Sequence, residues 1–223
     1  MNNGTLFIVA TPIGNLEDIT LRALRTLKEV EVIACEDTRV TSHLLSHYSI
    51  SKPLLSLHQH SGQFQFGKIL TLLKEGKSVA YVSDAGTPGV SDPGNKLVEQ
   101  AVAENFVVVP IPGASALATL ISVSGIDMQK FSFLGFPPHK KGRETFFKEV
   151  AVSEIPVLYY DSPHRVIKNI LLLQTFAPAK KIILGRELTK MFEEIVRGNA
   201  EEIEAYFSQN PTKMKGEFSV IVF

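Results

Sequence analysis

The chain has 223 residues, 44% of them hydrophobic, so it is long enough for one large or two small domains with buried cores. Its 23 basic and 23 acidic residues cancel, which argues against broad, nonspecific binding of nucleic acid. No apolar run has transmembrane length, no signal-like segment opens the chain, and the single cysteine, Cys35, excludes an intrachain disulfide and a cysteine zinc cluster. We therefore expect a cytoplasmic protein with no membrane partner.

The first half of the chain alternates apolar runs with amphipathic segments, the pattern of a parallel α/β unit. The apolar runs predict strands at residues 5–10, 31–35, 54–57, 78–83 and 106–111. Helical spacing predicts helices at residues 20–30, 64–75 and 95–104, and another that follows residues 36–39 and ends near residue 48. Leu21, Leu24, Leu27 and Lys28 stand at helical spacing in the first helix, and the leucines indicate its apolar face. Cys35 is expected to be a buried thiol, and Gly76 should end the third helix.

The loop after the fourth predicted strand is the most conspicuous in the chain. Residues 84–94 contain three glycines, two prolines and two aspartates, more turn residues than a plain connection needs. Glycine lets the backbone approach a ligand closely, and ligands of parallel α/β sheets bind at the carboxyl ends of the strands. The loop therefore predicts a binding site, and an ordinary βα connection is the alternative interpretation.

The loop after the first strand, residues 11–15, completes a strand, glycine loop and helix like those of nucleotide-binding folds. It has neither the Gly-x-Gly-x-x-Gly spacing of dinucleotide sites nor the Gly-Lys-Ser/Thr of a P-loop. A standard NAD or ATP site is therefore poorly supported.

Charged side chains follow the second strand, where Glu36, Asp37, Thr38 and Arg39 are consecutive. They are candidate functional residues, although Asp37 or Thr38 could instead cap the next helix, and the two roles can coexist. Further on, the pair His58 and His60 could bind a metal, but no cysteine or carboxylate stands nearby at a suitable spacing. A polar loop pair is favoured, and no metal site is predicted.

Two prolines and a glycine at residues 110–113 interrupt the alternation, so we place a domain boundary between residues 112 and 113. The N-terminal α/β domain would then span residues 1–112 and the C-terminal α/β domain residues 113–223. In the latter we predict strands at residues 131–134, 156–160, 181–185, 192–197 and 216–223. Helices are expected at residues 114–124, 144–152 and 166–175, and a turn and helix at residues 198–207.

A loop of the second half gathers cationic side chains: His139, Lys140, Lys141 and Arg143. Pro137 and Pro138 stiffen its start. A local patch of positive potential is enough for a neutral protein to hold RNA, so these residues are candidate RNA contacts. A solvated loop whose charges only aid solubility is the alternative.

Together these loops resemble the tetrapyrrole-methylase-like (class III) S-adenosylmethionine methyltransferases. Within them, the chain is similar to the small-subunit ribosomal RNA methyltransferase I family, which methylates a cytidine 2′-hydroxyl in the decoding centre of 16S rRNA. The resemblance covers essentially the whole chain; its motifs are residues 9–15, 36–39 with Leu44 and His47, 83–94, 112–116, 135–137, 162–165 and 186–190. Residues 36–39 with the following Leu and His are specific to the rRNA enzymes, whereas residues 112–116 support only the fold. Because the sequence ends at the predicted closing strand, we expect none of the tail-borne RNA contacts that some relatives carry.

The resemblance implies a two-domain α/β fold with S-adenosyl-L-methionine in the inter-domain cleft, and a homodimer acting on 16S rRNA within the small ribosomal subunit. Carried over by motif, the cofactor contacts would be Ile13, Gly14, Asp84, Ala85, Gly86, Ser115, Ala116, Tyr160, Glu187 and Leu188. Asp84 would bind the cofactor's ammonium or a ribose hydroxyl.

A ribose hydroxyl is a poor nucleophile, so transfer needs in-line placement and removal of the proton. Candidate catalytic residues are Glu36 or Asp37 as proton acceptor, with Arg39 and Lys190 holding phosphate or lowering the hydroxyl pKa. For each, a salt bridge or cap is the alternative, and His58 and His164 are weaker candidates for the base. Methylation of a corrin precursor and a non-catalytic nucleotide-sensing or RNA-binding module are the competing functions.

Overall fold

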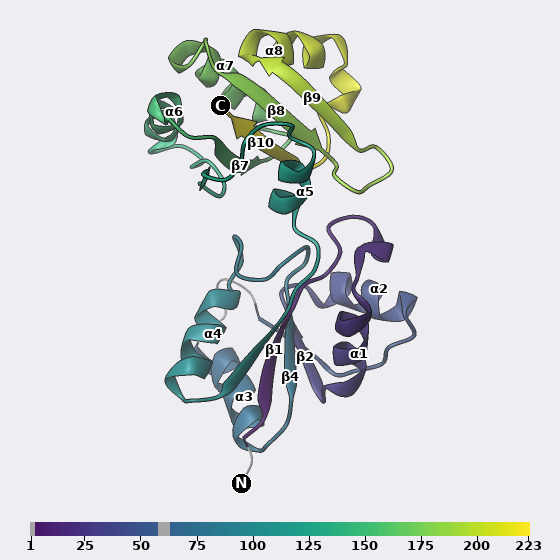
Figure 1. Cartoon of the computed structure of the whole chain (residues 1–223). Coiled ribbons are helices and arrows are strands. Elements are labelled where there is room, and N and C mark those ends of the chain that lie inside the picture. The colour runs from purple at the N-terminus through teal and green to yellow at the C-terminus, as the bar shows by residue number, and fades with distance from the viewer. Residues whose placement is uncertain (1–2, 58–62) are drawn as a thin grey trace. The chain divides into compact units, whose positions relative to one another are not determined.

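The computed structural model describes residues 3–57 and 63–223. Backbone contacts divide the chain into two compact units, Met1–Ser115 and Ala116–Phe223. Each unit contains one five-stranded sheet flanked by helices (Figure 1). None of the helices in the described part of the chain is long and apolar enough to cross a membrane.

The sheet of unit 1 is entirely parallel, with the strand order β3-β2-β4-β1-β5. Its strands are β1 (Thr5–Val9), β2 (Val32–Cys35), β3 (Leu54–Ser56), β4 (Val79–Val82) and β5 (Val107–Ile111). The helices are α1 (Leu21–Glu29), α2 (Thr38–His47), α3 (Gln63–Lys74) and α4 (Gly94–Ala103), preceded by the short 3-10 helix η1 (Leu16–Asp18). Every predicted element of this half is present, and only η1 was not foreseen.

Helices cover both faces of this sheet, with α1 and α2 on one side and α3 and α4 on the other (Figure 1). The side chains on the α3 and α4 face include Leu73, Tyr81 and Leu97, which are fully buried. Leu27 and Cys35 lie in the core on the α1 and α2 face, so the predicted burial of the thiol is confirmed. Because both faces are covered, the central strand β4 is a continuous buried apolar run rather than an alternating one.

One detail of the first helix differs from the prediction. Leu21 is 86% exposed, while Ala23, Thr26, Leu27 and Val30 are buried. These four residues follow the i, i+3, i+4, i+7 spacing of a helix face, and Leu21 precedes that set by two residues, so it points to the opposite side. The prediction of Leu21 as a core-facing residue was therefore wrong.

The sheet of unit 2 is mixed, with the order β6-β7-β10-β8-β9. Its strands are β6 (Ser132–Phe133), β7 (Val157–Asp161), β8 (Lys181–Arg186), β9 (Glu194–Asn199) and β10 (Phe218–Val222). Only β6 and β7 pair in parallel, and the other neighbours are antiparallel. The helices are α5 (Ala116–Ser122), α6 (Arg143–Val152), α7 (Val166–Phe176), α8 (Ala200–Gln209) and the short η2 (Pro211–Lys213).

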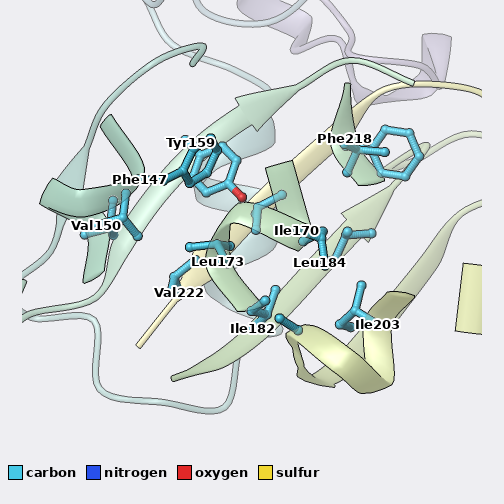
Figure 2. Packing of buried hydrophobic residues seen from close by; sticks show 14 of the residues in the cluster. Phe147, Val150, Tyr159, Ile170, Leu173, Ile182, Leu184, Ile203, Phe218 and Val222 are labelled. Atoms are coloured by element: carbon cyan, nitrogen blue, oxygen red, sulfur yellow. The ribbon is translucent and has the colours of Figure 1, made fainter. Parts of the chain in front are cut away.

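The main core of unit 2 lies between this sheet and the helices α6, α7 and α8 (Figure 2). Phe147 and Tyr159 pack edge to face there, with ring centroids 5.8 Å apart. Leu120 of α5 packs beside Gly185 of β8, where an added Cβ would lie 2.9 Å from the Leu120 Cδ1 atom. These contacts fix the strand ends from which the candidate residues of this unit project.

Candidate functional site

The loops after β1 and β4 are joined to each other at the carboxyl edge of the parallel sheet. The Thr11 N–H donates to the Gly86 carbonyl at 3.0 Å, and the Gly86 N–H donates to the Thr11 carbonyl at 3.1 Å. The Thr11 hydroxyl also donates to the Ser83 carbonyl at 3.2 Å. Two segments far apart in the sequence therefore form one backbone frame.

Gly86 is the closest meeting point in this frame. Its φ of +79° favours glycine, and an added Cβ would lie 3.1 Å from the Ile13 Cγ2 atom and 3.5 Å from the Ala114 carbonyl oxygen. The Cα atom of Ser115 would be 4.0 Å away. The structure thus brings together Ile13, Gly86 and Ser115, which are three of the predicted cofactor contacts, and leaves a cradle that a side chain would fill.

The loop after β2 joins the same frame through acidic side chains. The Asp37 N–H donates to the Asp84 Oδ1 atom at 2.9 Å, and the Asp84 N–H donates to the Glu36 Oε1 atom at 3.2 Å. Asp84 and Ala85 are exposed, as is Gly14 in the loop after β1. The predicted cofactor residues of unit 1 and the motif at residues 36–39 therefore share one edge of one sheet.

Asp37 and Arg39 form a two-point ion pair. The Arg39 Nη2 atom is 2.6 Å from the Asp37 Oδ2 atom, and Arg39 Nε donates to Oδ1 at 3.1 Å. Asp37 also caps α2, because its Oδ1 accepts the Arg39 N–H at 2.8 Å, so the predicted cap is confirmed. The hydrogen bonds from Arg39 lower the pKa of Asp37 to about 2, and the Arg39 side chain is 89% exposed. The carboxylate of Asp37 thus holds the exposed guanidinium of Arg39 in a defined orientation.

Asp92 organises the long loop, a role the sequence analysis did not assign. Its carboxylate accepts N–H groups from Gly89 at 2.5 Å, Val90 at 3.0 Å and Gly94 at 2.8 Å. An aspartate among glycines and prolines is a common signal for such a turn. The many turn residues in residues 84–94 indicated a functional loop, but they did not show which residue stabilises the loop backbone.

In unit 2, Tyr160 lies beside the start of α5, because its hydroxyl accepts the Leu117 N–H at 3.2 Å. This places Tyr160 close to Ala116, another predicted cofactor contact. The Tyr160 ring packs against Phe133 and Phe136, with centroid distances of 5.0 Å and 5.5 Å. The position of the Tyr160 side chain is thus fixed by ring packing at one end and by a hydrogen bond at its hydroxyl.

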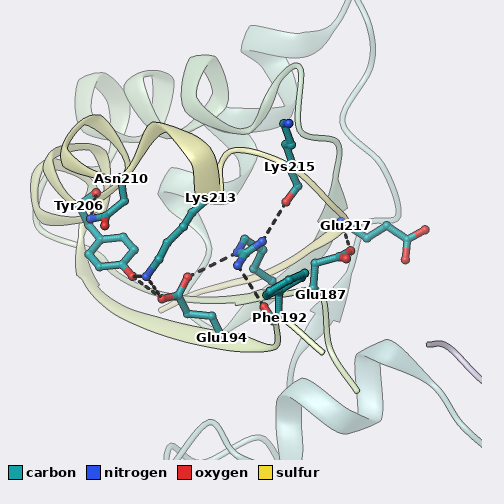
Figure 3. Close-up of polar contacts among 9 residues, drawn as sticks. Glu187, Phe192, Glu194, Tyr206, Asn210, Lys213, Lys215 and Glu217 are labelled. Atoms are coloured by element: carbon teal, nitrogen blue, oxygen red, sulfur yellow. Dashed lines mark hydrogen bonds and ion pairs between the residues drawn. The ribbon is translucent and has the colours of Figure 1, made fainter. Parts of the chain in front are cut away.

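The turn after β8 holds Glu187, Leu188 and Lys190. The Lys190 Nζ atom donates to the Glu187 Oε1 atom at 2.8 Å and to the Glu217 Oε2 atom at 3.0 Å, and Glu187 Oε1 also accepts the Glu217 N–H at 2.9 Å (Figure 3 shows both glutamates). Burial alone would lower the pKa of Lys190, but the hydrogen bonds that its ammonium donates to the carboxylates of Glu187 and Glu217 raise that pKa. Leu188 is buried, so the polar atoms it could offer a ligand are those of its backbone.

Arg186 is the first residue of the motif at residues 186–190, and the sequence predicted no role for it. The buried guanidinium donates to the carbonyls of Lys215 and Phe192, at 3.2 Å and 3.1 Å, and its Nε is 3.4 Å from Glu194 Oε2 (Figure 3). It therefore locks the β8–β9 hairpin to the segment before β10. The Lys215 carbonyl lies 29 residues along the chain from Arg186, so no local sequence signal could have found that contact.

The cationic loop lies before α6. His139, Lys140 and Lys141 are exposed, and Arg143 is half-buried at the first position of the helix. Arg165 fixes the start of this loop, because its Nη1 donates to the Pro137 carbonyl at 2.8 Å and its Nε donates to the Ser162 Oγ atom at 3.0 Å. The loop is therefore fastened to the β7–α7 turn.

Some candidates are not assembled in this way. His164 is exposed on the β7–α7 turn, and no hydrogen bond joins it to the other candidates among the residues described. His58 and His60 lie outside the described residues. Within residues 3–57 and 63–223, no group of three or more His, Cys, Asp or Glu side chains could hold a metal ion.

Comparison with known proteins identifies the class. A model of the family "Tetrapyrrole (Corrin/Porphyrin) Methylases" matches residues 5–204. Among solved structures, a cobalt precorrin-4 methyltransferase superposes with a TM-score of 0.74 at 16% identity, covering 97% of this chain and 94% of that one. A uroporphyrin-III C-methyltransferase from Thermus thermophilus gives 0.67 at 18% identity, with 98% and 94% covered. The predicted α/β methyltransferase fold is confirmed.

Curated relatives narrow the class. "Ribosomal RNA small subunit methyltransferase I" from Thermotoga maritima is 43% identical and covers 98% of this chain and 98% of the relative. The proteins of that name from Leptospira biflexa and Halalkalibacterium halodurans are 44% and 43% identical, covering 96% and 99% of this chain and 89% and 76% of the relatives. The chain belongs to the ribosomal RNA small subunit methyltransferase I family, within the tetrapyrrole methylases.

The cofactor of these methyltransferases is S-adenosyl-L-methionine. The cradle at Gly86 fits such a ligand, because close backbone approach and small residues are what a nucleoside cofactor needs there. The carboxylates of Glu36 and Asp84 suit a ligand that carries positive charge.

Proposed function

We propose that this protein transfers a methyl group from S-adenosylmethionine to the 2′-hydroxyl of a decoding-centre cytidine in 16S rRNA, within the small ribosomal subunit. The supporting observation is the frame in unit 1, where the loop around Gly86 adjoins an exposed Arg39 held by Asp37. The relatives' printed name supports ribosomal RNA as the substrate. We further propose that the protein acts in the cytoplasm as a homodimer.

When bound, S-adenosylmethionine supplies a methyl group on a positively charged sulfur, which leaves as a neutral thioether. The chain's own task is to place the ribose hydroxyl in line with that methyl group and to help the hydroxyl lose its proton. Arg39 carries a positive charge that favours the developing negative charge on the oxygen, or holds a neighbouring phosphate. Asp37 fixes the orientation of the Arg39 guanidinium through the ion pair between them.

The geometry bears on which carboxylate accepts the proton. A carboxylate with a pKa of about 2 and a two-point ion pair is a weak base, so we assign Asp37 to positioning Arg39. Glu36, in the same loop, is then the candidate acceptor. Lys190 is already held by two carboxylates, so we propose that it stabilises the turn that carries Glu187 and Leu188.

The direct test of this function maps the modified atom. Unmodified small subunits are incubated with the protein and labelled cofactor, the RNA is digested, and the labelled nucleotide is located and checked for 2′-O-methylation. We expect label on one cytidine of the decoding centre. Label on a base atom, or transfer to a corrin precursor but not to RNA, would refute the proposal. Cofactor binding without transfer to any RNA would favour a nucleotide-sensing module.

We propose that the loop with His139, Lys140, Lys141 and Arg143 binds RNA phosphates. Changing Lys140, Lys141 and Arg143 to serine should weaken subunit binding and reduce the slope of log affinity against log salt by about 2, since each lost phosphate contact on single-stranded RNA removes about 0.7. Affinity for S-adenosylmethionine should not change.

Arg25, Lys28 and Lys181 provide the matched control, because they are also one arginine and two lysines with exposed side chains. Their replacement by serine should leave the salt slope unaltered. Equal slopes for the loop variant and the wild type would place the RNA surface elsewhere in the protein.

A further inference from the structure

Phe136 is a large aromatic side chain on the surface of unit 2. It is 51% exposed and lies in the loop after β6, in the motif Gly135-Phe-Pro137, to which no function has yet been assigned. Its ring is tilted against Tyr160, with centroids 5.5 Å apart and an interplanar angle of 58°. One part of the ring therefore rests on the protein while another part is accessible from solvent.

Hydrogen bonds hold the backbone on both sides of Phe136. The Tyr160 N–H donates to the Gly135 carbonyl at 2.9 Å, and Arg165 donates to the Pro137 carbonyl at 2.8 Å. Phe136 is thus bracketed by two anchored neighbours, and proline follows it. A ring that is presented rigidly loses little conformational freedom when a ligand packs on it.

The charge of the adjoining chain indicates the kind of ligand. Residues 136–143 contain His139, Lys140, Lys141 and Arg143 but no acidic residue. In the part of the chain that the structure describes, none of these four side chains forms an ion pair. Asp161 is within electrostatic range of Arg143, but it is buried and accepts hydrogen bonds from Asn169 and Ser162. An exposed aromatic ring beside uncompensated cations matches what single-stranded RNA requires: a face for a base and charges for phosphates.

Phe192 shows that exposure alone does not make such a site. It is 66% exposed in the β8–β9 hairpin, but Glu193 and Glu194 follow it directly, and the nearby Lys190 is already paired with Glu187 and Glu217. Carboxylates there would repel RNA phosphates. The two phenylalanines therefore form a natural pair for comparison.

We propose that Phe136 is a stacking platform for an unpaired nucleobase of the substrate RNA, with the cations of residues 139–143 on the adjoining phosphates. The inference rests on the proposed function and goes further by naming the residue that recognises a base rather than the backbone. Stacking is tolerant of base identity, so Phe136 selects for an unstacked, accessible nucleotide. Double-stranded RNA offers no such face.

The test compares Phe136→Leu with Phe192→Leu. In methylation of unmodified small subunits, Phe136→Leu should raise KM for the subunit by about 5- to 150-fold, the range for loss of one base–aromatic stack. Phe136→Tyr should restore most of the affinity, and Phe192→Leu should match the wild type. Calorimetry should show unchanged affinity of Phe136→Leu for S-adenosylmethionine, whereas a loss there would assign Phe136 to the cofactor site and overturn the proposal.

A second measurement reads the stack directly. The chain contains no tryptophan, so Phe136→Trp carries a single tryptophan at the platform, whose fluorescence can be excited apart from that of the tyrosines. An unmodified fragment of small-subunit rRNA should quench its fluorescence, and should not quench Phe192→Trp. If wild-type protein methylates no subunit RNA, the proposed function itself fails. If wild-type protein does so and Phe136→Leu has the same KM, only the stacking platform fails.

Discussion

Replacing Gly86 by valine should reduce binding of S-adenosylmethionine below detection by calorimetry. Even a Cβ at this position would lie 3.1 Å from the Ile13 Cγ2 atom and 3.5 Å from the Ala114 carbonyl, and the two further methyl groups of valine would fill the cradle. The positive φ adds strain to any side chain there. The expected effect therefore combines a blocked ligand path with a displaced loop.

Gly67 offers the matched control, since an added Cβ would meet nothing within 4 Å. Gly67→Val should keep full cofactor affinity. Thermal unfolding of both variants separates a blocked site from a lost fold, and Gly86→Ala makes the same test with less strain. A folded Gly86 variant with wild-type affinity would move the cofactor site away from this loop.

Removing either partner of the pair between Asp37 and Arg39 should abolish most methyl transfer while leaving cofactor affinity intact. We expect Arg39→Ala to lower kcat by about 10²- to 10³-fold, the loss typical of one charge-stabilising donor. Asp37→Ala should have a similar effect, and the double variant should be little worse than either, because the two residues act as one unit. Single-turnover transfer to unmodified small subunits measures these values.

Asp37→Ser separates catalysis from capping. Serine is also a good N-cap, so this variant should keep α2 and the thermal stability of the protein while losing the ion pair with Arg39. Near-normal turnover of Asp37→Ser would show that the motif is only a cap. Because the pKa of Asp37 is about 2, the carboxylate remains charged above about pH 4, and the pH dependence of transfer near neutrality should not report its titration.

The helices and strands were predictable because their signal is local. Residues 79–82 are an uninterrupted buried run, and Asp37 has the residue type and position of a helix cap. Leu21 shows the limit of that reasoning, since the helix buries Leu27 together with Ala23 and Thr26 and leaves Leu21 exposed. The size of the apolar side chains therefore did not decide which face of α1 packs against the core.

The contacts within the candidate site were only partly predictable. Parallel strands that end together place the Gly86 loop beside residues 36–39, which follows from topology. The ion pairs of Lys190 could not be predicted from the sequence, because one of its carboxylate partners, Glu217, is 27 residues away. The three N–H bonds that Asp92 accepts depend on the path of the loop backbone, which residue types alone do not specify.

The position of β10 has a consequence for synthesis of the protein. This strand is the last in the chain, yet it lies between β7 and β8 in the second sheet. Until residues 218–222 have been made, β7 and β8 each present an unpaired edge, and the core around Phe147 and Ile170 lacks Phe218, Val220 and Val222. Unit 1 has all its strands within the first 111 residues, so its sheet can close early in translation, whereas the sheet of unit 2 closes only after residues 218–222 have been made.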